Sequence, residues 1–272
     1  MNKDKIVSMG KEILSIEPIR NMLDQNKCSF SFVAGSLVEG FGNEKSDVDV
    51  FIICQSLPVN QEVQKFFDIY PDSNVFYNNK NVVLTFTYEN MDFDVEFHLV
   101  SEVEKAIKRN NLKEIKSSDA YVDFLHRLKW SFFLNGEENY KAIKESVNYD
   151  CFSDIPVRYL SMIYSIKTTD IMGAYREEDF KTAFFMSWFL LEYCIDAYLS
   201  LFGETNPNNK WRVKKIDRLE MQSEYSGLNL SEIMENTFSN LELNNDLMLE
   251  KRTREVMRNC QIINNSIQKG RI

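Results

Sequence analysis

Two aspartates separated by one apolar residue, Asp47 and Asp49, begin a strand-like run of apolar residues that continues to Ile53. Side chains alternate between the two faces of a strand, so both carboxylates are expected on one face, with Val48 and Val50 on the other. Neighbouring carboxylates repel each other unless a cation holds them, and Mg²⁺ binds through such oxygen ligands together with substrate phosphates. The pair therefore predicts a divalent-metal site.

A third carboxylate is offered further along the chain by Asp92–Leu99, the sequence DFDVEFHL. Acidic and apolar residues alternate in this run, which predicts another strand with Asp94 and Glu96 on the same face. Either carboxylate would complete a metal site with Asp47 and Asp49, and the spacing leaves that choice open. Two divalent ions in such a site would stabilise charge on the attacking and leaving oxygens of a phosphate.

The residues before the aspartate pair have the types needed to bind a phosphate. A strand-like alternation from Ser29 to Val33 is followed by Gly35 and Ser36. Glycine has no Cβ, so a phosphate can approach the backbone N–H groups closely, and the Ser36 hydroxyl adds a donor. A turn glycine followed by a helix-capping serine is the simpler alternative. The nearby aspartate pair favours phosphate binding.

These elements, in this order, resemble the signature of the polymerase-beta-like nucleotidyltransferase superfamily. The matching residues are Gly35-Ser36, Asp47-Val48-Asp49 and Phe93-Asp94-Val95, and the resemblance covers residues 28–100. By position, Asp94 matches the third metal ligand of the family, and Glu96 lies two residues on with the same facing.

The resemblance implies a reaction and a set of ligands. A nucleoside monophosphate would be transferred from an NTP, expected to be ATP, to an acceptor hydroxyl, and pyrophosphate would leave. Asp47, Asp49 and Asp94 would bind Mg²⁺, with two ions expected, while Gly35 and Ser36 would position the β- and γ-phosphates.

The C-terminal half resembles, more loosely, the helical domains of aminoglycoside and lincosamide nucleotidyltransferases. The similarity lies in Asp196–Gly203 and in the segment Asn206–Arg212 that follows. It implies that Lys210, placed after a turn, contacts the triphosphate. It also implies a small-molecule acceptor, for example an aminoglycoside-like antibiotic.

Two acidic residues, Glu192 and Asp196, lie four positions apart in an otherwise apolar segment expected to be a helix, Phe180–Phe202. Carboxylates in such surroundings need partners or water. Glu192 is the candidate general base, or an anchor for a cationic substrate. A buried ion pair with a lysine or arginine of a neighbouring helix is the alternative.

The order of the elements predicts two domains. Strand and helix signals mix up to residue 115, which predicts an α+β domain over residues 1–115, a mixed sheet with flanking helices. From residue 116 to 272 helical periodicity dominates, in Ser118–Leu134, Pro156–Ala174, Phe180–Phe202 and Leu243–Ile267. This part is expected to form an all-α helical bundle.

Composition narrows the range of partners and surroundings. Acidic residues outnumber basic ones 41 to 32, a net charge of −9, which argues against nucleic acid as the main partner and suits a cationic small molecule. The five cysteines show no CxxC pairing, as in reduced thiols, and no signal peptide is evident. Charges within the apolar segment Phe184–Phe202 argue against a membrane span, so a cytoplasmic protein is expected.

Other functions remain compatible with the same residues. The acceptor could be a protein side chain, or the products could be oligonucleotides or cyclic dinucleotides. A protein that binds an NTP without turnover is a further alternative. The sequence does not determine the oligomeric state.

Overall fold

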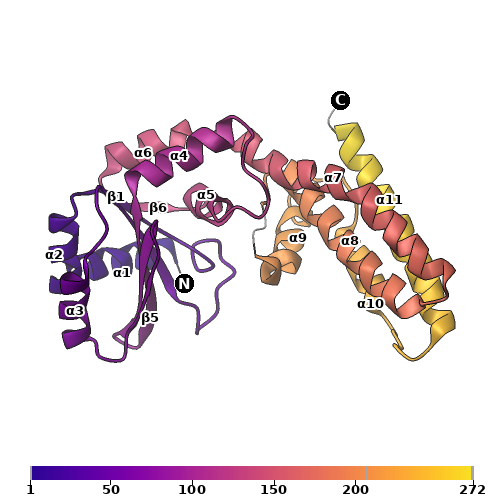
Figure 1. The fold of residues 1–272 in the computed structure, drawn as a ribbon, viewed down its shortest axis with the longest axis horizontal. Coiled ribbons are helices and arrows are strands. Elements are labelled where there is room, and N and C mark those ends of the chain that lie inside the picture. The colour runs from indigo at the N-terminus through magenta and orange to yellow at the C-terminus, as the bar shows by residue number, and fades with distance from the viewer. Residues whose placement is uncertain (1, 206–207, 271–272) are drawn as a thin grey trace. The chain divides into compact units, whose positions relative to one another are not determined.

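The computed structural model describes residues 2–205 and 208–270, which form two compact units (Figure 1). The first unit combines residues 2–114 with Asp123–Tyr149. The second combines Ile115–Val122 with the described residues from Asp150 onward.

A mixed six-stranded sheet forms the centre of the first unit. Its strand order is β3 (Asn74–Tyr77), β4 (Asn81–Tyr88), β5 (Met91–Leu99), β2 (Val48–Cys54), β1 (Cys28–Ala34) and β6 (Phe132–Asn135). The strands β2 and β5 pair in parallel, and the other neighbours pair antiparallel. The expected mixed sheet with flanking helices is therefore present.

Three helices cover one face of this sheet: α1 (Lys3–Ser15), α2 (Glu17–Gln25) and α3 (Asn60–Ile69) (Figure 1). Their apolar residues form one core with the inward residues of the strands, such as Val50 and Val95. The apolar residues from Lys11 to Leu23 recur at helical spacing, but they belong to two helices, α1 and α2. The break falls at Ile16, whose extended backbone ends α1, and Pro18 lies in the first turn of α2, where a missing N–H costs nothing.

Helices α5 (Tyr121–Lys129) and α6 (Glu137–Ser146) cover the opposite face. Phe32 of β1 and Phe51 of β2 stack there with their ring centroids 4.9 Å apart. Phe124 of α5 and Tyr140 of α6 pack on Phe32. Helix α4 (Val100–Asn111) directly follows β5 in the chain.

The first unit extends beyond the expected boundary at residue 115. The segment Ser118–Leu134 was expected to be helical throughout, but α5 ends at Lys129 and β6 follows. β6 pairs antiparallel with β1, which brings α5 and α6 onto the sheet. A short apolar run such as Phe132–Leu134 has no periodicity that separates strand from helix, and tertiary pairing decides its conformation.

The second unit is helical throughout its described residues. Its helices are α7 (Tyr149–Arg176), α8 (Phe180–Leu201), α9 (Arg212–Glu220), α10 (Leu230–Phe238) and α11 (Asp246–Gly270), with a 3₁₀ turn, η1, at Asn209–Trp211. The core forms mainly where α7, α8 and α11 pack together, and Cys194 and Cys260 are buried in it as free thiols.

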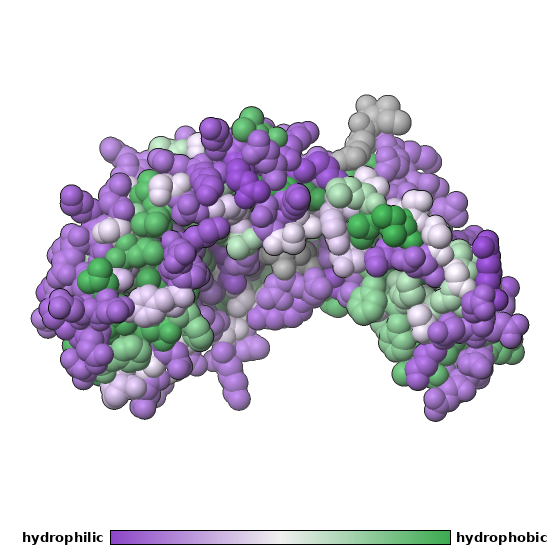
Figure 2. Space-filling model, in the orientation of Figure 1, coloured by the Kyte–Doolittle hydropathy of each residue, from purple (hydrophilic) through white to green (hydrophobic). Residues whose placement is uncertain are grey.

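Helix α8 is long and apolar enough to cross a membrane by length and composition, and 56% of its most apolar window is buried inside the protein. Phe185 and Phe189 are among its exposed apolar residues. Figure 2 shows hydrophobic areas of this kind within a largely hydrophilic surface.

Candidate active site

Three aspartates converge on the sheet face that α5 covers. In the parallel pair β2–β5, Asp49 lies directly opposite Asp94, and Asp47 immediately precedes β2. One carboxylate oxygen from each residue lies within 4.8 Å of the other two. A set of closely spaced carboxylate oxygens is the donor chemistry that Mg²⁺ prefers, so these residues fit the metal that the sequence implies.

Glu96, the alternative third ligand, lies outside this cluster of three aspartates. It is two residues farther along β5, opposite Phe51, and its Oε2 is 2.9 Å from His98 Nε2. The His98 ring also stacks on Phe51, with the ring centroids 5.8 Å apart. The geometry therefore favours Asp94 over Glu96 as the third ligand.

Burial and mutual repulsion disfavour the charged forms of these carboxylates. The Asp49 side chain is 9% exposed. Burial, with a smaller effect from the neighbouring carboxylates, raises the pKa of Asp49 to about 7, although the Arg127 guanidinium acts in the opposite direction. Burial also raises the pKa of Asp94, against the hydrogen bond that Thr85 Oγ1 donates to Asp94 Oδ1 at 2.7 Å. A divalent cation would relieve this repulsion.

Gly35 lies in contact with the Asp49 carboxylate and has a positive φ of 90°. A Cβ atom at this position would be 1.7 Å from Asp49 Oδ2. Glycine at position 35 therefore suits both the backbone conformation and the space that Asp49 occupies, and a larger residue would displace the Asp49 carboxylate.

The turn after Gly35 presents backbone donors. The Ser36 carbonyl accepts hydrogen bonds from the N–H groups of Phe41 and Gly42, at 2.8 and 2.9 Å. The N–H groups of residues 36–38 donate to no other group in the described part of the chain. Consecutive N–H groups without an intramolecular partner, as at the start of a helix, form a site for an anion. Gly35 and Ser36 thus belong to a turn that suits a phosphate.

Helix α5 contributes contacts to both parts of the site. Arg127 Nη1 donates to Asp49 Oδ2 at 3.2 Å. The neighbouring His126 has its Nε2 2.8 Å from Oε1 of Glu39 in the Gly35 turn, and both side chains are almost fully buried. The helix therefore fixes the position of the turn and contacts the Asp49 carboxylate.

Arg127 was missed by the sequence analysis because 78 positions separate it from Asp49. The one signal that could have led to it is the apolar run Phe132–Leu134. If that run is taken as a strand, the preceding helix must pack on the sheet.

In the second unit, Glu192 and Asp196 of α8 share a partner, Arg212 of α9. Arg212 donates to both oxygens of Asp196 at 2.9 Å and to Oε1 of Glu192 at 2.5 Å. The Arg212 side chain is 6% exposed. This is the buried ion pair that the sequence left open as the alternative, and the role of Glu192 as a general base stays a prediction.

Lys210 lies on η1 and is exposed, and its Nζ is 5.0 Å from the centroid of the Trp211 ring. Its contact with a triphosphate stays a prediction. Asn206 and Pro207, part of the segment that suggested this role, lie outside the described residues.

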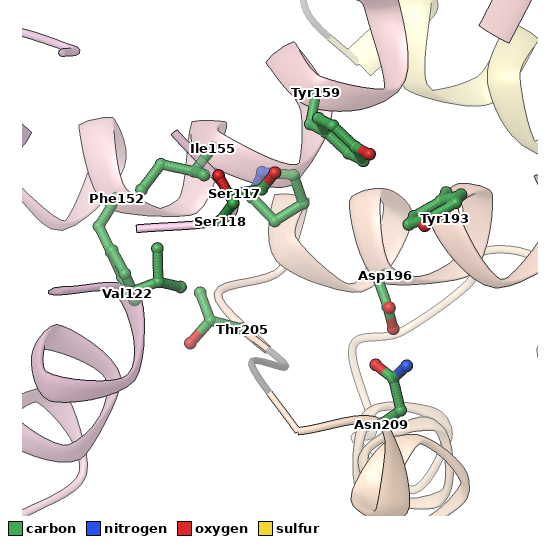
Figure 3. Close-up of a pocket in the computed structure, with 11 residues that line it drawn as sticks. Ser117, Ser118, Val122, Phe152, Ile155, Tyr159, Tyr193, Asp196, Thr205 and Asn209 are labelled. Carbon is green, nitrogen blue, oxygen red and sulfur yellow. The ribbon is translucent and has the colours of Figure 1, made fainter. Parts of the chain in front are cut away.

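A pocket of about 310 Å³ lies within the second unit (Figure 3). Tyr159 of α7 and Tyr193 of α8 line one end of it, with their rings edge to face at 5.4 Å. Asp196 and Asn209 point toward each other beside them, and Phe152 lies at the other end. Apolar and aromatic walls with a few polar groups are typical of small-molecule sites.

Comparisons with known proteins give a distant structural likeness. No family model matches the chain, and no curated protein matches its sequence. Among solved structures, the chain is similar to a nucleotidyltransferase-like protein from Exiguobacterium sibiricum 255-15. The two are 8% identical, with a TM-score of 0.46, over 92% of this chain and 76% of the other. A likeness of this size does not assign the chain to a family.

Proposed function

We propose that the protein is a Mg²⁺-dependent nucleotidyltransferase that moves a nucleoside monophosphate, with AMP from ATP as the expected case, to an acceptor hydroxyl. The observation that carries the proposal is the placement of three aspartates beside a glycine turn whose N–H groups 36–38 have no partner in the described chain. Carboxylates for metal ions and N–H groups for phosphates are the two things that a metal–NTP complex needs.

In this mechanism the acceptor oxygen forms a bond to the α-phosphorus while the α–β phosphoanhydride bond breaks. Pyrophosphate leaves, and the proton of the hydroxyl passes to a carboxylate or to water. Bound Mg²⁺ would neutralise charge on the phosphate oxygens. Asp47, Asp49 and Asp94 hold the metal, and the turn after Gly35 orients the β- and γ-phosphates. Catalysis then depends on positioning and on charge neutralisation.

For the acceptor we propose a small molecule that binds in the pocket of the second unit. The Tyr159 and Tyr193 rings offer apolar faces, and Asn209 offers hydrogen-bonding groups. Two carboxylates, Glu192 and Asp196, lie beside the pocket, and Asp196 is part of its lining. Their negative charge favours an acceptor with an amino group, such as an aminoglycoside-like compound.

The test is pyrophosphate release from each of the four NTPs with Mg²⁺, with and without a panel of aminoglycosides and lincosamides. Acceptor-dependent release that disappears in the Asp47→Asn/Asp49→Asn variant is the expected result. Pyrophosphate release without any acceptor would indicate self-modification or nucleotide polymer synthesis and would refute the small-molecule acceptor. If Mg·NTP binds but no acceptor gives release, the protein is an NTP-binding protein and the proposed transfer is wrong.

For the pocket, Tyr193→Ala is expected to raise the KM for the acceptor and leave the KM for the NTP unchanged. Phe189→Ala is the matched control, because Phe189 lies one turn away on the same helix and outside the pocket lining. Equal effects of the two substitutions would refute the assignment of the pocket.

A further inference from the structure

Arg127 lies between the two features that a metal–nucleotide complex would use. Its Nη1 donates to Asp49 Oδ2 at 3.2 Å. A Cβ on Gly35 would lie 2.9 Å from the same Nη1. The guanidinium therefore meets a metal-site carboxylate at the point where the chain leaves β1 and enters the turn with the unpartnered N–H groups.

The contact between Arg127 and Asp49 uses one nitrogen and one oxygen. The Nε atom of Arg127 points to another partner, Asp123 Oδ2, at 3.4 Å. Asp123 precedes Arg127 by one helical turn, and its side chain is 52% exposed, against 9% for Asp49. Arg127 thus has one buried and one surface partner, so it can give up the first and still be held by the second.

A metal ion bound by the three aspartates would share the Asp49 carboxylate with Arg127. Mg²⁺ coordinates oxygen at about 2.1 Å and requires near-octahedral geometry, so an ion bound to Asp49 Oδ2 would approach the Arg127 N–H donor. Like charges at such a distance repel strongly where the surroundings are partly buried. The guanidinium is also less strongly hydrated than an ammonium group and carries five donors that match phosphate oxygens.

We propose that Arg127 is a displaceable counter-ion of the metal site. Mg²⁺ takes Asp49 from Arg127, and the released guanidinium donates to the triphosphate beside the Gly35 turn. The second half of this inference rests on the proposed nucleotidyltransferase function. Arg127 thereby couples metal binding to phosphate binding through a single side chain.

The test compares Arg127→Gln with Lys129→Gln, which removes the same charge from the same helix. Mg²⁺ and Mn²⁺ affinities are measured by calorimetry without nucleotide at pH 8.5, where protons compete little for Asp49. In Arg127→Gln the metal is expected to bind roughly tenfold more tightly, since its competitor is gone. A non-hydrolysable ATP analogue with Mg²⁺ is expected to bind at least about tenfold more weakly. Lys129→Gln is expected to change neither affinity.

Opposite shifts of the two affinities separate this role from a structural one, in which both would fall together. Metal binding that is unchanged or weaker in a folded Arg127→Gln protein, checked by circular dichroism, would overturn the inference. If that variant does not fold, Arg127→Lys replaces it, with a smaller shift expected in the same directions. Failure of the wild type to bind metal or analogue refutes the proposed function itself. Alternatively, the wild type binds metal and loses that binding in Asp49→Asn, while Arg127→Gln binds like the wild type. That result refutes only the counter-ion role.

Discussion

Replacement of Gly35 by alanine tests the contact on which the proposed metal site depends. The added Cβ would lie 1.7 Å from Asp49 Oδ2 and 2.7 Å from its Cγ, whereas ordinary contacts begin at 3.4 Å. The Asp49 carboxylate must therefore move away by about 1.7 Å. A displacement of about 1 Å at a reacting centre lowers the reaction rate about 100-fold. We expect Gly35→Ala to weaken Mg²⁺ binding and to lower turnover by at least about 100-fold.

Gly40→Ala is the matched control for this substitution. Gly40 belongs to the same turn and has a similar φ of 80°, but a Cβ there would meet nothing within 4 Å. The positive φ should cost both variants about 1–2 kcal/mol in the free energy of unfolding, measured with urea. Calorimetry with Mg²⁺ then isolates the effect of the clash with Asp49. Equal metal affinities in the two folded variants would refute the placement of Asp49 against Gly35.

Three further predictions concern charge and hydrogen bonding. Because the folded-state pKa of Asp49 is raised to about 7 from 3.8, its ionised form destabilises the metal-free fold above pH 7. The free energy of unfolding in EDTA should rise by at most about 4 kcal/mol as the pH falls from 8 toward 4. The Mg²⁺ affinity should fall over the same pH range. A free energy of unfolding and a metal affinity that do not change with pH would contradict this. Thr85→Val removes the hydrogen bond to Asp94 and should weaken Mg²⁺ binding about tenfold, with Thr87→Val as a control on the same strand. Arg212→Gln leaves two carboxylates of α8 without their buried partner and should lower the free energy of unfolding by about 3 kcal/mol, measured with urea. A loss below 0.5 kcal/mol would show that the pair contributes about as little as a surface ion pair.

The sequence predicted that the aspartate carboxylates share one face of the sheet, because the alternation of side chains along a strand is a local property. The runs around Asp49 and Asp94 lie in β2 and β5, with the carboxylates on one face. The direct pairing of these two residues could not be predicted, because register depends on contacts between strands that the sequence does not encode locally.

Arg127 and the strand β6 were missed for the same reason. β6 is only four residues long, and its conformation comes from pairing with β1. Without that pairing, α5 has no predicted neighbour, and Arg127 has no visible relation to Asp49. Likewise, the acidic pair of α8 could be identified by spacing, but its partner Arg212 became evident only when α9 was placed.

The division of the chain bears on how this protein can be shortened or recombined. Between residues 114 and 150 the chain passes from the first unit to the second, back to the first, and again to the second. A fragment that ends at residue 115 would lack an edge strand and the helix that holds the Gly35 turn in place. The first unit is therefore not contiguous in sequence. Exchange of the helical unit between related proteins by a single crossover at residue 115 would separate Asp49 from Arg127, whereas a crossover near residue 150 would keep them together.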